Sequence, residues 1–414
     1  MTNNKLIRTL LRLVGLRACA FWFKHHRREF HLHVKPYKNG ARCVQCQRRG
    51  KIVRTLPEAR VWRDVPVCGW AVFFHYFPRE IECPTHGRAQ ELIPWAEGYA
   101  RVTYRLEFLV VVYSQQMTQK AAAELLHLPK STFSDILHRT ITRCRDGHRV
   151  RGLKALGSDE VSYRKGHKYV TVVYDLERAC VVWVGPGKAR ETIDRFFNEV
   201  LSDYQKRQVQ WACCDMSETY IGAITEHCPN AQLVLDRFHI AKALNAALDE
   251  VRKEQWREAT GDERKALKGL RWLLFRHPAT RSKGDTRLLN QLCKSNRRIH
   301  RAWILKDEFN QFWNYKTQRG AKRFLKQWTT TALKSRLAPL RKFVNTIRKY
   351  TDNILTFIDS RLTNATAEGL NRVIRMVKNR ASGFRTVEAF IDLIYLTVGD
   401  VDIPAQIPKK FHTL

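Results

Sequence analysis

The sequence predicts an α+β protein built from several domains. Its 414 residues are 44% hydrophobic, which is enough to bury a core and suggests two to four domains. The hydrophobic pattern changes along the chain, with aromatic strands up to about residue 95 and helical spacing over 100–147. Strands and helices alternate over 152–239, and helical spacing returns from 240 to about 350. These changes indicate a β-rich module, a helical pair, an α/β core and a helical block.

The charge of the chain predicts a polyanionic partner. Lys and Arg number 74 against 39 Asp and Glu, which gives a formal charge of +35. Nucleic acid is the commonest partner for a surplus of this size. The alternative is a generally basic protein of the ribosomal kind, in which the charge serves no sequence-specific site.

The cysteines and the N-terminus indicate a protein of a reducing compartment. Eleven cysteines are scattered along the chain, which argues against a disulfide framework. Near the N-terminus, apolar residues recur at helical spacing and arginines interrupt them, so we expect an amphipathic helix rather than a signal peptide. The apolar residues are Leu6, Leu10, Leu11 and Val14, and the arginines are Arg8, Arg12 and Arg17. No stretch approaches the roughly 20 apolar residues of a membrane span, so we expect no membrane partner and a cytoplasmic location.

The first block carries two pairs of metal-ligand residues, each with two residues between the ligands. They are Cys43 and Cys46 in "CVQC" and Cys83 and His86 in "CPTH". Because each turn can direct both of its ligands at one ion, this spacing predicts a closed tetrahedral Zn²⁺ site with a structural role. The alternative is that these four residues are unrelated. Cys68 and His75 lie between the two pairs in the sequence and are further candidate ligands.

The segment "MTQKAAAELLHLPKSTFSDILHRTITR" predicts two short helices joined by a tight turn. Thr118 caps the first helix, Pro129 ends helical geometry, and Ser131 caps the second. The apolar contacts between the two helices are expected from Ala122, Leu125, Leu128, Phe133 and Ile136. In a helix-turn-helix the second helix enters the major groove, where Lys130, Ser131, Thr132 and Ser134 would face DNA. An ordinary hairpin of two helices has the same pattern.

The α/β block has the element order strand, strand, strand, helix, strand, helix, strand. The strands are expected at "LKALGSD", "KYVTVVYDL", "ACVVWVG", "VQWACCD" and "AQLVLD", and the helices at "ETIDRFFNEVLSDY" and "SETYIGAITEHC". This order indicates a ribonuclease-H-like mixed sheet covered by helices, in which the first and fourth strands are neighbours. Asp159 ends the first strand and Asp215 the fourth, so the two carboxylates should converge.

Two converging carboxylates predict a divalent cation site. Mg²⁺ prefers oxygen ligands, and a pair of such ions can activate water or a 3′-hydroxyl in phosphodiester chemistry. The alternative for an aspartate at a strand end is a turn or cap residue. Glu160 follows Asp159 and should point to the opposite face, so it is the second choice.

Three long blocks resemble the ISL3 family of bacterial insertion-sequence transposases. They are "SDEVSYRKGHKYVTVVYDLE", "CCDMSETYIGAITEHCPNAQLVLDRFHIAKALNAALDEVR" and "NATAEGLNRVIRMVKNRASGFRTVEAF". The resemblance implies a DDE transposase that cuts and joins DNA strands with Mg²⁺ (or Mn²⁺), with Asp159, Asp215 and Glu368 as the catalytic, metal-binding residues. It also implies binding to terminal inverted repeats and target DNA, both double-stranded, and a homodimer or higher oligomer that holds two ends together.

Further residues should support this site. Glu368 lies near a predicted helix start, capped by Thr363 or Asn364, and Asn371, Arg372 and Arg375 share nearly its face. The alternative is a solvated helix face with ordinary ion pairs. "DRFH", from Asp236 to His239, resembles the Asp/Cys-x-x-His pattern that follows the second aspartate in transposases with helical insertions. Capping of the next helix is the competing role for Asp236.

The block between the second aspartate and Glu368 is too long for a direct connection, so the helical residues 240–350 are expected to interrupt the core. Its Trp and Phe residues alternate with Lys and Arg and either contact DNA or form the core of the insertion. We expect the core role for most of them.

We therefore expect a zinc-binding β-rich module, a helix-turn-helix and a ribonuclease-H-like catalytic core interrupted by an all-helical insertion. The expected segments are an N-terminal helix and strand segment (1–35), the zinc-binding domain (36–95), the helix-turn-helix DNA-binding domain (96–150), the first part of the core (151–239), the insertion (240–350), the last part of the core (351–400) and a C-terminal tail (401–414). The alternatives to a transposase are a non-catalytic DNA-binding regulator and a structure-selective nuclease of the same fold.

Overall fold

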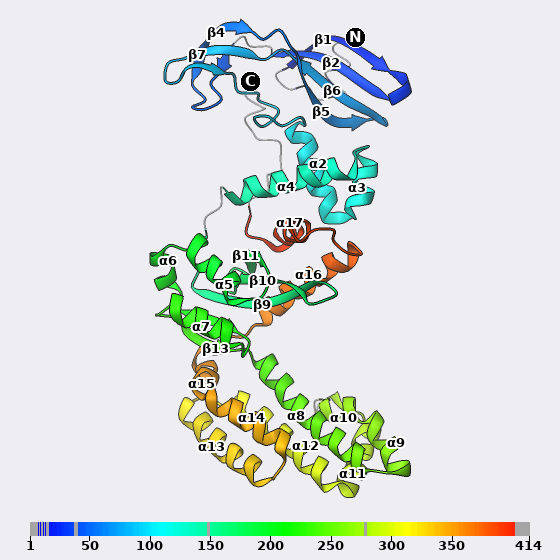
Figure 1. Cartoon of the computed structure of the whole chain (residues 1–414), viewed down its shortest axis with the longest axis vertical. Coiled ribbons are helices and arrows are strands. Elements are labelled where there is room, and N and C mark those ends of the chain that lie inside the picture. Colours follow the sequence, from blue (N-terminus) through cyan, green and yellow to red (C-terminus); the bar gives the residue numbers. More distant parts are fainter. Residues whose placement is uncertain are drawn as a thin grey trace. The chain divides into compact units, whose positions relative to one another are not determined.

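The computed structural model describes residues 7, 9, 11, 13, 16–36, 40–146, 150–276 and 280–401. The chain divides into two compact units, the first formed by Met1–Arg149 with Val373–Leu414 and the second by Val150–Arg372 (Figure 1). Most of the predicted N-terminal helix and the tail over 402–414 lie outside the described residues. Within the described part of the chain, no helix has the length and apolar character needed to cross a membrane. The described residues form both sheets and helices, so the chain is a mixed α/β protein, as predicted.

The β-rich part of the first unit contains two four-stranded sheets. The first has the order β1-β2-β6-β5, from β1 (Leu16–Lys24), β2 (Glu29–Pro36), β6 (Trp70–Tyr76) and β5 (Arg60–Val67). The second has the order β3-β4-β7-β8, from β3 (Ala41–Arg42), β4 (Arg49–Thr55), β7 (Arg79–Cys83) and β8 (Gly87–Gln90). Alternation in sequence buries one face of the first sheet, where Trp62, Val72 and Phe74 pack together.

Within the described residues, the α-helices of the first unit are α2 (Tyr104–Gln116), α3 (Gln119–Leu125), α4 (Lys130–Asp146), the end of α16 (Ala365–Arg380) and α17 (Val387–Val398). Thr118 caps α3 as predicted, since its hydroxyl accepts a hydrogen bond from the amide of Ala121. The prediction that Ser131 caps α4 is wrong. The Pro129 carbonyl accepts from the amide of Phe133 at 3.0 Å, so the helix begins at Lys130 and Ser131 lies inside its first turn.

One predicted contact between α3 and α4 is also wrong. Leu125 is 57% exposed, whereas Ala122, Ala123 and Leu126 are buried. The helical period places positions 122, 123 and 126 on one face and turns position 125 away from it. The remaining predicted contacts, Leu128, Phe133 and Ile136, are buried as expected.

The sheet of the second unit has the order β11-β10-β9-β12-β13. Its strands are β9 (Ala155–Arg164), β10 (Lys168–Asp175), β11 (Cys180–Pro186), β12 (Trp211–Cys214) and β13 (Gln232–Leu235). β9, β10 and β11 pair antiparallel, and β12 is parallel to both β9 and β13. The first and fourth strands are therefore neighbours, as predicted.

Two details of this unit differ from the prediction. Asp159 does not end its strand, because β9 continues to Arg164 as a hairpin with β10. The expected helix over 191–204 is interrupted: α5 (Arg190–Arg195) continues into the π-helical turn η2 (Phe196–Val200) and stops at the extended residue Leu201. Ser202 then starts α6 (Asp203–Gln208) with a capping box, and this local signal competes with continuation of the longer helix. α7 (Glu218–His227) follows β12.

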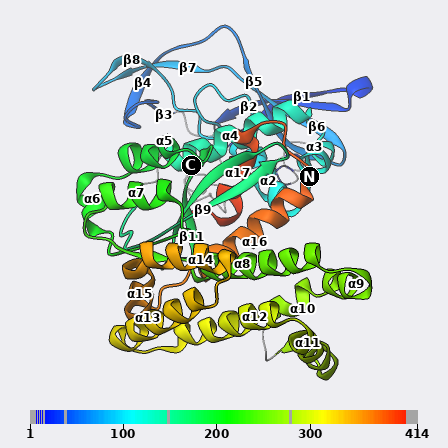
Figure 2. The same cartoon turned by 60° about the horizontal axis from the view of Figure 1, so that its bottom comes forward.

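The rest of the second unit is helical (Figure 2). Its helices are α8 (Arg237–Glu258), α9 (Gly261–Gly269), α10 (Arg271–Phe275), α11 (Lys283–Ser295), α12 (Arg297–Phe309), the 3-10 turn η4 (Asn310–Asn314), α13 (Gln318–Lys334), α14 (Ala338–Lys349), α15 (Thr351–Ser360) and the start of α16 (Ala365–Arg380). Most aromatic residues of this block are core residues, as expected: Phe309, Phe312 and Trp328 are buried, while Trp272 is 69% exposed.

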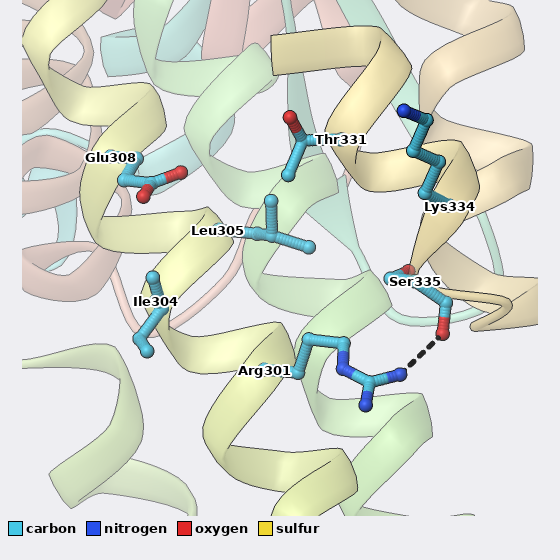
Figure 3. A pocket seen from close by; sticks show the side chains of 7 residues that line it. All are labelled: Arg301, Ile304, Leu305, Glu308, Thr331, Lys334 and Ser335. Carbon is cyan, nitrogen blue, oxygen red and sulfur yellow. Dashed lines mark hydrogen bonds between the residues drawn. The ribbon is translucent and has the colours of Figure 1, made fainter.

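A pocket of about 310 Å³ opens between α12 and α13 (Figure 3). Its lining residues are Arg301, Ile304, Leu305, Glu308, Thr331, Lys334 and Ser335, and the Arg301 guanidinium donates to the Ser335 carbonyl at 3.0 Å. The lining contains one carboxylate, that of Glu308. Since Ca²⁺ and Mg²⁺ sites use several oxygen ligands, this pocket is not the expected divalent cation site.

Candidate active site and metal centre

Cys43, Cys46, Cys83 and His86 come together in the second sheet of the first unit. One ligand atom from each lies within 4.8 Å of the others, and the Sγ atoms of Cys46 and Cys83 are 3.4 Å apart. Among the described residues this is the one group of three or more Cys, His, Asp or Glu side chains close enough to share a metal ion. Cys68 and His75 lie outside it, since Cys68 is exposed and the His75 ring is 2.9 Å from that of His31.

The surroundings of the cluster favour metal binding. Backbone N–H groups of Thr85 and His86 donate to the Cys83 sulfur and lower the pKa of its thiol to about 6. These donors favour the Cys83 thiolate, which is the form that binds a metal. Three sulfurs and one imidazole are a donor set that suits tetrahedral Zn²⁺.

Three aspartates lie at the same level on three adjacent parallel strands of the second unit, Asp159 within β9, Asp215 just after β12 and Asp236 just after β13. The last pair between β9 and β12 is Gly157 with Cys213, so Asp159 and Asp215 each lie two residues beyond it. Cys214 pairs with Leu235, so Asp236 follows β13 in register with Asp215. Neighbouring strands are about 4.8 Å apart, so the register places the three backbones side by side.

Burial and mutual repulsion act on these carboxylates. Burial raises the pKa of Asp159, and the charges of Asp215 and Asp236 raise it further. The Asp215 carboxylate accepts from the amide of Ser217 at 3.0 Å, which orients it at the start of the following turn. Excess negative charge of this kind favours a bound cation.

Asp236 combines the two roles considered for it. One carboxylate oxygen caps α8 by accepting from the amide of Phe238 at 3.0 Å. The other lies 2.9 Å from Nδ1 of His239. This hydrogen bond is the main cause that raises the pKa of His239, and the charges of Asp159 and Asp215 add to it. The aspartates therefore favour the protonated form of His239.

α16 contacts Asp159 through Asn371, a residue expected on the face of Glu368, and this hydrogen bond was not predicted. The Asn371 amide donates to Oδ2 of Asp159 at 2.7 Å, and the Tyr174 hydroxyl donates to Oδ1 of Asn371 at 2.6 Å. Glu368 lies one turn earlier, with its amide bonded to the Asn364 carbonyl at 2.8 Å. The spacing of three residues from Glu368 was the available signal for Asn371.

Glu368 and Arg372 have exposed side chains. Within the described ranges, no three of Asp159, Asp215, Asp236, His239 and Glu368 form a group at metal-ligand distance, so the carboxylates are neighbours by backbone register. Glu160 is directed at Lys188, whose Nζ lies 4.0 Å from its carboxylate, and burial raises the pKa of Glu160. The structure thus groups Asp159, Asp215, Asp236 and His239, with Asn371 joined to Asp159.

A mixed sheet with a row of aspartates, in a strongly basic chain, is typical of the broad class of metal-dependent proteins that act on nucleic acids. A profile of the ISL3 transposases, described as "Transposase", matches residues 156–394. The transposase for insertion sequence element IS1001 of Bordetella parapertussis is 30% identical over 378 residues, covering 89% of this chain and 91% of that protein. The chain belongs to the ISL3 family of transposases.

Two further similarities accompany this match. The transposase for insertion sequence element IS1557 of Mycobacterium tuberculosis (strain CDC 1551 / Oshkosh) is 27% identical over 381 residues, covering 86% of this chain and 85% of that protein. The structure of the Drosophila P element transposase strand transfer complex aligns with a TM-score of 0.39 at 10% identity, covering 72% of this chain and 92% of that chain.

Proposed function

We propose that this transposase binds the terminal inverted repeats of an insertion sequence and catalyses Mg²⁺-dependent strand cleavage and strand transfer. The reactions are phosphodiester hydrolysis and transesterification by a ribonuclease-H-like core of the DDE type, which the helical block over 240–350 interrupts. The single observation that carries the proposal is the strand register that sets Asp159 and Asp215 side by side.

The donor set fits a hard divalent cation. The carboxylates of Asp159 and Asp215 would supply the oxygen ligands that Mg²⁺ or Mn²⁺ prefers, and Glu368 would be the third ligand. Bound divalent ions supply activation of the attacking water or 3′-hydroxyl and stabilisation of the leaving oxygen. Asp236 holds His239 beside the aspartates, where an imidazolium attracts the scissile phosphate. Arg372, four residues after Glu368, adds a cation for the DNA backbone.

The first unit supplies DNA recognition. α3 and α4 form a helix-turn-helix, in which Lys130, Ser131, Thr132 and Ser134 contact DNA. Lys130 and Ser131 are exposed, and Ser134 donates to the side chain of Gln119 at 3.3 Å, which orients it at the start of α4. The Cys43, Cys46, Cys83 and His86 cluster holds a structural Zn²⁺ that shapes the neighbouring module.

Transposition requires two element ends in one complex, so the active form is a homodimer or higher oligomer on DNA. Its partners are the terminal inverted repeats and the target, both double-stranded. The formal charge of +35 favours contact with the phosphates of several DNA segments at once. Because its substrate is DNA, we expect the protein at the bacterial nucleoid, in the cytoplasm.

Replacement of one exposed lysine tests the recognition helix. We expect Lys130→Ala to weaken binding to the element ends, and to reduce the slope of log affinity against log salt by about 1, because one phosphate contact is lost. Fluorescence anisotropy over a salt series measures both quantities. Lys120→Ala is the control, since Lys120 is also exposed but lies on α3, 4.0 Å from Glu124. Equal losses in the two variants would contradict a specific role for α4.

A further inference from the structure

We propose that Tyr174 and Asn371 form a hydrogen-bond relay that fixes the Asp159 carboxylate for metal binding and holds the start of the Glu368 helix against the sheet. The proposal rests on the proposed function, because it assumes that Asp159 is a metal ligand. It makes Tyr174 and Asn371 positioning residues, which act through Asp159 and do not touch the reacting atoms.

The chemistry of the three groups sets the direction of the relay. An ionised carboxylate only accepts hydrogen bonds, so Asn371 must turn its NH₂ group toward Oδ2 of Asp159, at 2.7 Å. The carbonyl oxygen of the Asn371 amide then faces Tyr174, whose hydroxyl must donate to it, at 2.6 Å. This direction suits an ionised Asp159, which is the form that binds a cation.

Burial prevents water from replacing the relay. Tyr174 is 0% exposed and Asn371 is 4% exposed. Loss of one member therefore removes a hydrogen bond from a buried polar group, which is costly. Without the Tyr174 hydroxyl, the amide of Asn371 loses the donor that fixes its orientation toward Asp159.

The relay leaves Asp159 with free coordination positions. Oδ1 accepts from the amide of Glu160 at 2.7 Å and Oδ2 accepts from Asn371. Each carboxylate oxygen has about two lone-pair positions, so each keeps one for a metal. The two hydrogen bonds hold the carboxylate from both oxygens and prevent its rotation, which is how groups behind metal ligands raise affinity.

β9 carries no side chain at Gly157, where the start of α16 approaches the sheet. Tyr174 pairs with Gly157 across β10 and β9, and Asp159 is the next residue of β9 on that face. A Cβ atom at Gly157 would lie 2.7 Å from Cδ2 of Leu176 and 3.3 Å from Oδ1 of Asn364, the residue before α16. Glycine at 157 thus lets the start of α16 lie close to β9, so that Asn371 reaches Asp159 from the helix that carries Glu368.

Tyr174→Phe and Asn371→Ala test the relay in the full-length, zinc-loaded protein. We expect each to raise the Kd for Mn²⁺ by about tenfold or more, the usual effect of removing a group behind a metal ligand. Isothermal titration calorimetry without DNA measures the Kd, and the melting temperature without Mn²⁺ measures stability. Nicking by Tyr174→Phe should recover at saturating Mn²⁺. Tyr204→Phe is the matched control, because Tyr204 is 71% exposed on α6.

Asp159→Asn separates failure of the relay from failure of the proposed function. If Asp159→Asn loses Mn²⁺ binding while both relay variants keep the unaltered Kd, the relay is wrong and the metal site stands. A lower melting temperature with an unaltered Kd also overturns the relay, because the pair would then serve stability alone. If Asp159→Asn binds Mn²⁺ as well as the unaltered chain, the metal site itself is wrong and the relay fails with it.

Discussion

Asp215→Asn and Asp159→Asn should each abolish metal-dependent cleavage at the element ends while leaving DNA binding intact. Each substitution removes a charged oxygen ligand from the site where Asp159 and Asp215 lie in register. Metal ions supply several kcal/mol of transition-state stabilisation in such reactions, so we expect the cleavage rate to fall at least about a thousandfold. Denaturing gels of end-labelled DNA measure the rate, and gel shifts measure binding.

Asp203→Asn is the matched control, since Asp203 is exposed on α6 of the same unit. It should cleave like the unaltered chain. Glu368→Gln should also lose metal-dependent cleavage, because Glu368 is the proposed third ligand. Cleavage by Asp215→Asn at the unaltered rate would contradict the assignment of the site.

Cys83→Ser should unfold the metal-binding sheet and remove specific DNA binding. The buried core of that sheet consists of Ala41, Cys43, Ile81 and Cys83, so two of its four members are ligands of the cluster. An apolar core of this size cannot stabilise a sheet alone, and structural zinc contributes about 10 kcal/mol or more to such modules. Most of the stability of this region should therefore come from the metal.

Metal analysis and limited proteolysis check this expectation. The unaltered protein should carry one zinc per chain and resist cleavage over residues 40–92, and Cys83→Ser or treatment with a strong chelator should end both properties. Cys68→Ser is the control, because Cys68 is an exposed cysteine outside the cluster. Full resistance to protease in the zinc-free protein would show that the sheet needs no metal.

The parts of the site that sequence reasoning could predict depend on local spacing or on sheet topology. The ligand pairs of the cysteine and histidine cluster are each separated by two residues, so one turn explains each pair. Asp159 and Asp215 were expected to be neighbours because the strand order places the first and fourth strands together, and β9 and β12 do pair. The length of β9 was not predicted, because its hairpin with β10 continues without a turn residue at Asp159.

The parts that were missed depend on contacts between distant residues or on competing local signals. Asn371 was expected on the face of Glu368, but its hydrogen bonds to Asp159 and Tyr174 were not predicted, because these distant residues meet only when α16 lies on the sheet. Ser131 and Leu125 were misassigned because a shift of one residue at a helix start or on a helix face changes the role of a side chain. At Leu201, the capping box of Ser202 ended a helix whose apolar pattern continued.

The most direct test of the account is a cleavage assay on linear DNA that carries the element's own terminal repeats, with and without Mg²⁺. The account predicts strand breaks at the ends of the repeats only when Mg²⁺ is present, and joined products when target DNA is added. Specific binding without breaks in either Mg²⁺ or Mn²⁺, or breaks that do not require a divalent ion, would contradict it.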